Sequence, residues 1–282
     1  MRITPFQALA CPLDGLPLQC NGSAWRCPSG HSFDIAGQGY THLLPVQNKR
    51  SRDPGDSKAM VDARRRFLAA GFYRPIAAAV NRLARADLPA DAACSCLDAG
   101  CGEGYYLREL AAAVPEERTL ALLGLDISKW AVRAAARQDR RINWVVGSNA
   151  SLPVLSGTLD RVLCLFGFPV YPEFARVLKP GGRLIQVDSG PDHLRELREI
   201  IYPDLKPERP PGLQAPPGFS RLPEETVRFP IALTHAGEIA DLLTMTPHFY
   251  RASAAGRARA AALTALSLGV EVRLTCFERN PD

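Results

Sequence analysis

The stretch that decides the fold of this chain is Cys94-Ser-Cys-Leu-Asp98-Ala-Gly100-Cys-Gly102-Glu-Gly104-Tyr-Tyr106. Its first five residues predict a buried strand, and the glycines predict a tight turn into an amphipathic helix through Leu107 and Leu110. Glycines let the backbone approach a ligand closely, and the start of the helix offers unpaired N–H groups. The stretch therefore predicts a nucleotide-type binding loop between a strand and a helix.

A second strand is predicted over 120–126. It ends in Asp126, which follows Gly104 by 22 residues and is placed to accept both hydroxyls of a ribose. From Ala93 onward strands alternate with helices, which predicts a parallel sheet with helices on both faces.

Three features separate the possible nucleotide ligands. Tyr105 stands where the dinucleotide pattern has its last glycine, which disfavours a pyrophosphate. The chain contains no Gly-x-x-x-x-Gly-Lys-Ser/Thr sequence, so a phosphate-loop hydrolase is excluded. Asp98 and Glu103 would repel phosphate but could pair with the amine or the sulfonium of S-adenosylmethionine.

The chain resembles the class I S-adenosylmethionine-dependent methyltransferases. Four motifs stand in the order of that class: Asp98-Ala-Gly-Cys-Gly-Glu-Gly104, Gly124-Leu-Asp126-Ile-Ser128, Leu159-Asp160 and Leu178-Lys-Pro-Gly-Gly182. The resemblance implies an α/β fold with a Rossmann-like, seven-stranded class I methyltransferase sheet. Its last two strands, near 227–233 and 268–277, would form an antiparallel edge. The alternation of apolar and polar residues over 270–276 independently supports a half-buried final strand.

Residues 11–34 predict a small β-hairpin with two knuckles at its open end. Segments 16–20 and 23–27 flank Asn21-Gly22, which favours a two-residue turn. The knuckles begin at Cys11 and Cys27 and have the layout of a zinc ribbon, although Asp14 stands where a second cysteine is expected. The predicted tetrahedral ligands are Cys11, Asp14, Cys27 and His31.

Cys20 is not expected to share this metal. In a two-residue hairpin it pairs with Ser23 at the turn, about 13 Å from the knuckles at roughly 3.3 Å per residue. The alternative to a zinc site is a metal-free ribbon held by the packing of Leu18 and Trp25.

Nearly all of the net charge of +5 lies in the first quarter of the chain, where residues 1–66 carry nine Lys and Arg against five Asp and Glu. An anionic partner such as nucleic acid would bind there. A polar segment precedes a helix that Ser57 caps and that runs to about Ala70. Three consecutive arginines on it span most of a turn, so at least two should be exposed. The predicted phosphate contacts are Lys49, Arg50, Arg52, Arg64 and Arg65, and the alternative is pairing with Asp53, Asp56 and Asp62.

The N-terminal motifs look like those of the bacterial 23S rRNA guanine-N1 methyltransferases. They are the ribbon through Asp34, Gly39-Tyr-x-x-Leu-Leu-Pro45, Lys49-Arg-Ser-Arg-Asp-Pro-Gly-Asp56 and Ala63-Arg-Arg-x-Phe67. The resemblance covers nearly the whole chain. It is closer to the Gram-negative type, which modifies one guanine in the hairpin 35 loop, than to the Gram-positive type, which modifies a neighbouring guanine.

This resemblance implies three parts and a reaction. A zinc-ribbon-like RNA-binding domain would span 1–46, a basic linker and helical bridge 47–92, and the methyltransferase domain 93–282. The expected reaction moves a methyl group from S-adenosylmethionine to N1 of a guanine in 23S rRNA, with Zn²⁺ as a second cofactor. Family members form homodimers. The departure from the family is Asp14, a cysteine ligand in its members, which bears on zinc affinity and not on methylation.

The resemblance also implies the cofactor site. By the family, Tyr73, Glu103, Gly104 and His193 would contact the cofactor, and by the wider class so would Asp98, Gly100, Gly102, Asp126, Ile127 and Asn149. Guanine N1 must lose a proton before it attacks, so a general base is expected. Asp188, His193 and, with less support, Asp160 are candidates, and the sequence does not choose among them. Phe168 could stack on a splayed guanine, and the alternative is a core aromatic.

Two other functions fit part of the sequence. A small-molecule methyltransferase could carry the ribbon as an accessory module, and an adaptor could carry a decayed methyltransferase fold. The intact acids at Asp98, Glu103 and Asp126 oppose decay. The chain has no membrane span and no apolar signal region, so a cytoplasmic location and reduced cysteines are expected.

Overall fold

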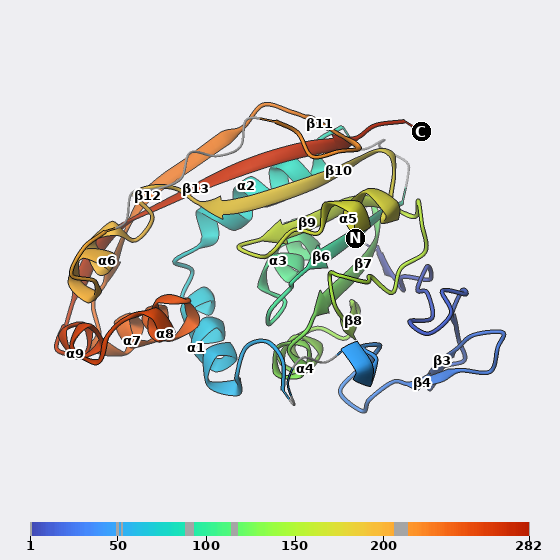
Figure 1. Ribbon diagram of the computed structural model, residues 1–282, viewed down its shortest axis with the longest axis horizontal. Coiled ribbons are helices and arrows are strands. Elements are labelled where there is room, and N and C mark those ends of the chain that lie inside the picture. The colour runs from blue at the N-terminus through green and yellow to red at the C-terminus, as the bar shows by residue number, and fades with distance from the viewer. Residues whose placement is uncertain are drawn as a thin grey trace.

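A large, mostly parallel sheet of ten strands runs through the molecule (Figure 1). The computed structural model describes residues 2–48, 51, 53–87, 93–113, 118–205 and 214–281. In spatial order the strands are β11 (Phe219–Arg221), β13 (Leu266–Arg279), β10 (Leu178–Ser189), β9 (Leu159–Leu165), β6 (Cys94–Ala99), β7 (Thr119–Asp126), β8 (Asn143–Val146) and β5 (Tyr40–His42), with β1 (Arg2–Thr4) beside β7 and β12 (Glu225–Leu233) beside β13.

Seven of these strands form the class I methyltransferase sheet that the motifs predict. Strands β8, β7, β6, β9 and β10 are parallel neighbours, and β13 lies antiparallel between β10 and β12. The predicted antiparallel edge is therefore confirmed. Three short strands, β1, β5 and β11, extend the sheet beyond the seven.

The N-terminal segment is not separate from this sheet. Ile3 of β1 lies opposite Leu120, and Thr41 of β5 lies opposite Val145, both in parallel pairs. Only the middle of the segment forms a small sheet of its own, from β2 (Gln19–Cys20), β3 (Ala24–Arg26) and β4 (Ser32–Asp34). Strands β1 and β5, which lie before and after the ribbon, thus both pair with strands beyond the predicted domain boundary at residue 46.

The register of the ribbon hairpin differs from the prediction. Cys20 lies opposite Trp25 and not opposite Ser23, so the turn contains four residues instead of two. The cause is the side chain of Asn21, whose Oδ1 accepts a hydrogen bond from the backbone N–H of Ala24 at 2.9 Å. An asparagine that bonds its own backbone in this way favours a longer turn.

The helices cover both faces of the large sheet. They are α1 (Lys58–Ala69), α2 (Arg74–Arg85), α3 (Tyr105–Ala113), α4 (Lys129–Gln138), α5 (Tyr171–Val177), α6 (Arg195–Ile201), α7 (Ala236–Met245), α8 (His248–Arg251) and α9 (Ala254–Ala261), with a 3-10 turn at Val46–Asn48. The predicted cap of α1 is confirmed, because the Ser57 hydroxyl accepts from the backbone N–H of Met60.

Two hydrophobic cores follow from the alternation of side chains along the strands. Cys96 and Leu163 face the core beneath α2 and α3, whereas Leu97 and Val162 face the core beneath α5 and the N-terminal ribbon. The carboxyl ends of the parallel strands meet at one edge, which is where open α/β sheets bind ligands. Within the described residues, no helix has the length and apolar content that crossing a bilayer requires.

Candidate functional site

The glycine loop joins β6 to α3. It lies beside Asp126, the last residue of the neighbouring strand β7. The backbone N–H of Gly102 donates to Oδ2 of Asp126 at 2.9 Å, and that of Ser128 donates to Oδ1 at 2.8 Å. These bonds fix the carboxylate at the end of β7. Burial raises the pKa of Asp126, and both backbone N–H groups oppose the rise. An acid held in this way can accept further hydrogen bonds from ribose hydroxyls.

Asp98 is the penultimate residue of β6, beneath the loop, and its side chain has no hydrogen-bond partner among the described residues. Its side chain is 1% exposed. Burial, with the charge of Asp126 second, raises its pKa to about 8. A buried carboxyl group is costly without a partner, so the site calls for a cation or a hydrogen-bond donor. The ammonium group of S-adenosylmethionine fits this requirement.

Gly104 is the last residue of the glycine loop and is tightly packed against Trp144. Its φ is +83°, and a Cβ added there would lie 2.4 Å from Cη2 of Trp144. No L side chain fits at that distance, so this position requires glycine. Trp144 lies on β8, and the loop therefore rests directly on the neighbouring part of the sheet.

Glu103 is less available than the sequence predicts. Its side chain is buried, and Oε2 accepts hydrogen bonds from Arg108 at 3.0 Å and from Gln138 at 2.7 Å. The carboxylate thereby ties α3 to α4. Of the two carboxylate oxygens, Oε1 has no partner in the described residues. Glu103 could therefore contact a cofactor through Oε1 or through its backbone.

Three aromatic side chains from distant loops meet beside the loop. The hydroxyl of Tyr73 lies 3.4 Å from Nε2 of His193, and the ring of Phe166 lies 6.2 Å from Tyr73 and 6.0 Å from His193. Burial lowers the pKa of His193 to about 4, so its imidazole is neutral at pH 7. The structure thus brings together the predicted pair Tyr73 and His193.

Phe166 is a site residue that the sequence analysis missed. It follows β9 with a φ of +54°, which is rare for an aromatic residue, and its ring lies near Tyr73 and His193. No sequence pattern marks that strain. Phe168, the residue predicted to stack on a guanine, is 88% exposed, so its ring is open to a partner.

The candidate bases are not equivalent. Asp160 begins β9, at the opposite edge from the glycine loop, and its carboxylate binds Ser95 and Lys179. Asp160 is therefore a structural residue, and its candidacy is wrong. Asp188 lies near the end of β10, where burial raises its pKa while the amide of Gln186 donates to Oδ2 at 2.6 Å. Asp188 and His193 remain at the correct edge.

Asn149 and Ile127 lie on the loops that follow β8 and β7. The Asn149 amide donates to the carbonyl of Ala99 at 3.3 Å, and its Oδ1 is buried without a partner in the described part of the chain. Ile127 is partly buried and packs against the core beneath α2 and α3. Both side chains therefore lie near the carboxyl edge, and their contact with the cofactor stays a prediction.

The predicted RNA contacts divide into three groups. Lys49, Arg50 and Arg52 lie outside the described residues. Arg65 is exposed and lies 3.8 Å from Asp62, so its surface position is confirmed. Arg64 is only about a quarter exposed and is paired with Asp56, so the prediction of a free surface cation is wrong there. That pairing is the alternative that the sequence left open.

Four side chains of the ribbon converge on one point. The donor atoms of Cys11, Asp14, Cys27 and His31 all lie within 4.8 Å of one another. Nδ1 of His31 is 3.5 Å from Sγ of Cys11, 3.3 Å from Sγ of Cys27 and 3.2 Å from Oδ2 of Asp14. Tetrahedral zinc bonds of about 2.0 to 2.3 Å place ligand atoms about 3.3 to 3.8 Å apart. The donor set and its spacing fit Zn²⁺, and Cys20 does not belong to the cluster.

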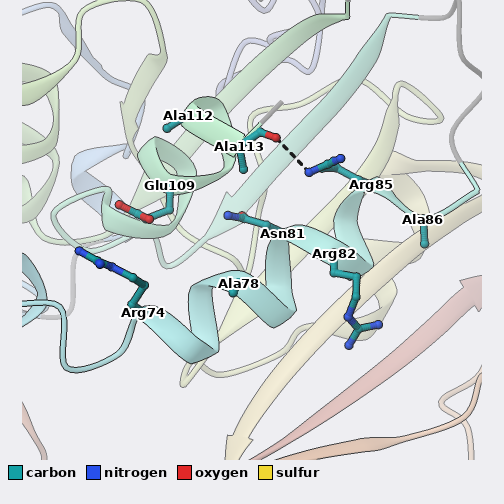
Figure 2. Close-up of a pocket in the computed structure, with 9 residues that line it drawn as sticks. All are labelled: Arg74, Ala78, Asn81, Arg82, Arg85, Ala86, Glu109, Ala112 and Ala113. Carbon is teal, nitrogen blue, oxygen red and sulfur yellow. Dashed lines mark hydrogen bonds between the residues drawn. The ribbon is translucent and has the colours of Figure 1, made fainter. Parts of the chain in front are cut away.

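A groove of about 700 Å³ lies between α2 and α3 (Figure 2). Alanines form much of its wall, and Arg74, Arg82 and Arg85 line it together with Glu109. Arg82 is paired with Glu225, and Arg85 donates to the carbonyl of Ala113. None of the predicted cofactor residues lines this groove, so it is not the cofactor site.

The comparisons with known proteins agree with this geometry. Residues 9–52 match the model of the RlmA N-terminal zinc ribbon, and residues 96–182 match the model of a methyltransferase domain. The chain is 35% identical over 240 residues to the 23S rRNA (guanine(748)-N(1))-methyltransferase of Streptomyces fradiae, covering 83% of each protein.

A second relative comes from Micromonospora griseorubida. This relative is named a putative 23S rRNA (guanine-N(1)-)-methyltransferase. The two proteins are 40% identical over 206 residues, which is 67% of this chain and 68% of the relative. Both relatives are more than 30% identical to the chain over two thirds or more of their length, and the ribbon at residues 9–52 matches as well. The chain belongs to the RlmA family of 23S rRNA (guanine-N1)-methyltransferases.

Proposed function

We propose that this protein transfers a methyl group from S-adenosylmethionine to N1 of a guanine in 23S rRNA. The observation that carries the proposal is the buried, unpartnered carboxyl group of Asp98 at the glycine loop, in a chain that also carries the RlmA ribbon. The loop supplies a site for the cofactor, and the ribbon supplies a module for RNA.

The cofactor site is assembled from the loop and its neighbours. Asp126 would accept the ribose hydroxyls, Asp98 the ammonium group, and Asn149 would lie near the adenine. S-adenosylmethionine supplies an electrophilic methyl group on a sulfonium. Tyr73 and His193 are both buried, and their rings would exclude water from the reacting atoms.

The acceptor must lose a proton before it attacks. Guanine N1 is protonated at neutral pH, and in-line positioning alone does not remove that proton. Neutral His193 and the carboxylate of Asp188 are the two candidates for this step. A variant that lacks the base should lose kcat and one limb of the pH profile, whereas a variant that lacks a cofactor contact should raise the KM for the cofactor.

The ribbon would hold Zn²⁺ through Cys11, Asp14, Cys27 and His31. The metal would fix the two knuckles relative to each other, and its role would be structural because all four positions are filled by protein atoms. Lys49, Arg50 and Arg52, which follow the ribbon in the sequence, and Arg65 on α1 would then bind phosphates of the RNA. The division into parts at 1–46, 47–92 and 93–282 stays a working description, since β1 and β5 join the large sheet.

The finer site of methylation belongs to this proposal as well. We place it in the hairpin 35 loop, and the choice between the neighbouring guanines of the two family types stays a prediction. A homodimer and a cytoplasmic location, where ribosomal RNA is found, are parts of the same proposal.

The test is to incubate the protein with methyl-labelled S-adenosylmethionine and unmodified bacterial 23S rRNA, and to digest the RNA to nucleosides. Label in 1-methylguanosine is the expected result. Because a methyl group at N1 blocks base pairing, a stop in primer extension then maps the guanine. Cofactor binding without label in RNA would contradict the proposal and favour a small-molecule acceptor.

A further inference from the structure

Arg64 lies over the glycine loop. On α1 its neighbours Ala63 and Phe67 are buried in the core, while Arg64 itself is about a quarter exposed. Its Nη1 lies 3.6 Å, and its Cδ 3.8 Å, from the point where a Cβ of Gly102 would be. The guanidinium group therefore approaches the backbone of the loop from the side of α1.

Two contacts hold Arg64 in that place. One nitrogen is paired with the carboxylate of Asp56, and Nη2 donates to the carbonyl of Met245 at 2.8 Å. Met245 ends α7, so this bond satisfies one of the carbonyls that a helix C-terminus leaves unpaired. The arginine is thus positioned by two other elements before any ligand arrives.

The charge of Arg64 acts on both sides of the cofactor site. Burial raises the pKa of Asp126 and of Tyr106, and the positive charge of Arg64 opposes the rise in each group. The Tyr106 hydroxyl is itself buried without a partner in the described residues. The charge of Arg64 therefore acts on Asp126, the predicted ribose contact, and on Tyr106 in the first turn of α3.

We propose that Arg64 binds the α-carboxylate of the methionine part of S-adenosylmethionine. The amino acid end of this cofactor is a zwitterion, so it needs an acid for its ammonium group and a cation for its carboxylate. Asp98 supplies the acid, and Arg64 supplies a planar fork of donors that suits a carboxylate. Asp56 holds the fork in place from the other side.

This assignment replaces the RNA contact that the sequence predicts for Arg64. A phosphate contact requires an exposed cation, and on α1 the exposed cations are Lys58, Arg65 and Arg66. Arg64 instead turns toward the loop and the end of α7. The inference rests on the proposed cofactor site and not on the identity of the RNA.

The experiment compares two cofactors that differ only in the carboxylate. S-adenosylmethionine and decarboxylated S-adenosylmethionine are titrated by calorimetry into the full chain without RNA. The variants are Arg64→Gln, Arg64→Lys and the control Arg66→Gln. Arg66 is a matched control because it also joins α1 to α7, through Asp241, but is largely exposed.

For Arg64→Gln we expect S-adenosylmethionine to bind roughly 10- to 100-fold more weakly, the range of a lost charged hydrogen bond. Decarboxylated S-adenosylmethionine should bind the variant and the wild-type protein equally well. Arg64→Lys should recover part of the loss, and Arg66→Gln should show none.

Two results would overturn the inference. If Arg64→Gln weakens both cofactors equally, Arg64 acts only by holding α1 and α7 together. If it weakens neither, Arg64 does not touch the cofactor. Failure of the wild-type protein to bind S-adenosylmethionine is a different outcome, because it would remove the cofactor site itself.

Discussion

The ribbon and the large sheet keep their shapes by different means. The three ribbon strands are two or three residues long, and a cluster of four donor atoms lies where the knuckles meet. The sheet instead has strands of up to 14 residues, with apolar cores on both faces. Short strands bury too little apolar surface to be stable alone, so the ribbon should depend on a metal and the sheet should not.

The two regions also carry the two proposed binding functions, RNA binding in the ribbon and cofactor binding at the sheet. The donor cluster lies in the ribbon, whereas the unpartnered Asp98 lies at the carboxyl edge of the sheet. If each region carries its own function, damage to one should spare the other. The five predictions below test that independence, from the largest expected effect to the smallest.

Replacing Cys27 by alanine should abolish rRNA methylation and leave cofactor binding intact. A structural zinc site contributes most of the folding energy of a small ribbon, so we expect methylation to fall at least about 100-fold. Zinc content, methylation and calorimetric S-adenosylmethionine affinity are measured on the same preparation. Cys20→Ala is the control, because Cys20 is an exposed cysteine outside the cluster. Normal methylation by Cys27→Ala would show that the cluster is dispensable.

Replacing Gly104 by alanine should lower the free energy of unfolding of the protein far more than Gly22→Ala does. Both glycines have positive φ, +83° and +93°, so the backbone strain is similar. A Cβ at Gly104 would overlap Trp144, whereas nothing lies within 4 Å of one at Gly22. Chemical denaturation should give a free energy of unfolding about 2 to 4 kcal/mol lower for Gly104→Ala than for Gly22→Ala. Equal losses would mean that strain, and not packing, sets the requirement for glycine.

Asp14→Cys should strengthen zinc binding without changing the sheet. A thiolate is a softer ligand than a carboxylate and matches Zn²⁺ better. Competition with a chelator should show binding tighter by on the order of tenfold, the lower end of what one altered contact at a metal site produces. S-adenosylmethionine affinity should stay the same. Weaker zinc binding would indicate that the knuckle is shaped for Asp14.

Cofactor affinity should rise with pH between about pH 6 and pH 7. Burial raises the pKa of Asp98 to about 8, so its carboxyl group is mostly protonated at pH 7, and only the ionised form attracts an ammonium group. Between pH 6 and pH 7, where the ammonium group of the cofactor stays protonated, we expect an increase of up to about tenfold, with a proton released on binding. Calorimetry in buffers of different ionisation enthalpy counts that proton. Asp98→Asn should bind weakly and independently of pH, and a wild-type curve without slope would contradict the assignment.

The same carboxyl group affects stability. Because its folded pKa lies above the ordinary value of 3.8, stability is lost as the pH rises from about 4 to about 8. Without cofactor, Asp98→Asn should therefore be more stable than the wild-type protein at pH 9. The ribbon, which lacks this group, should not show that gain.

Much of the cofactor site was predictable because its parts are close in sequence. The loop from Gly100 to Gly104 and the acid at Asp126 follow their strands directly, so the strand pattern places them at one edge. The ribbon cluster was predictable for the same reason, since each knuckle spans four or five residues. The hairpin register was not, because one hydrogen bond of Asn21 changed the length of the turn.

The sequence alone indicated the alternation of strands and helices after Ala93, the glycine loop, the two acids Asp98 and Asp126 and the donors of the ribbon. These features depend on local spacing, which the chain carries in itself. The tertiary structure decided which side of α1 carries Arg64, and it brought Tyr73, Phe166 and His193 together. Tyr73 and His193 are separated by 120 residues, and their contact depends on how the loops pack over the sheet. Such contacts arise only when many weak apolar interactions fix the elements at once, and no short pattern records them.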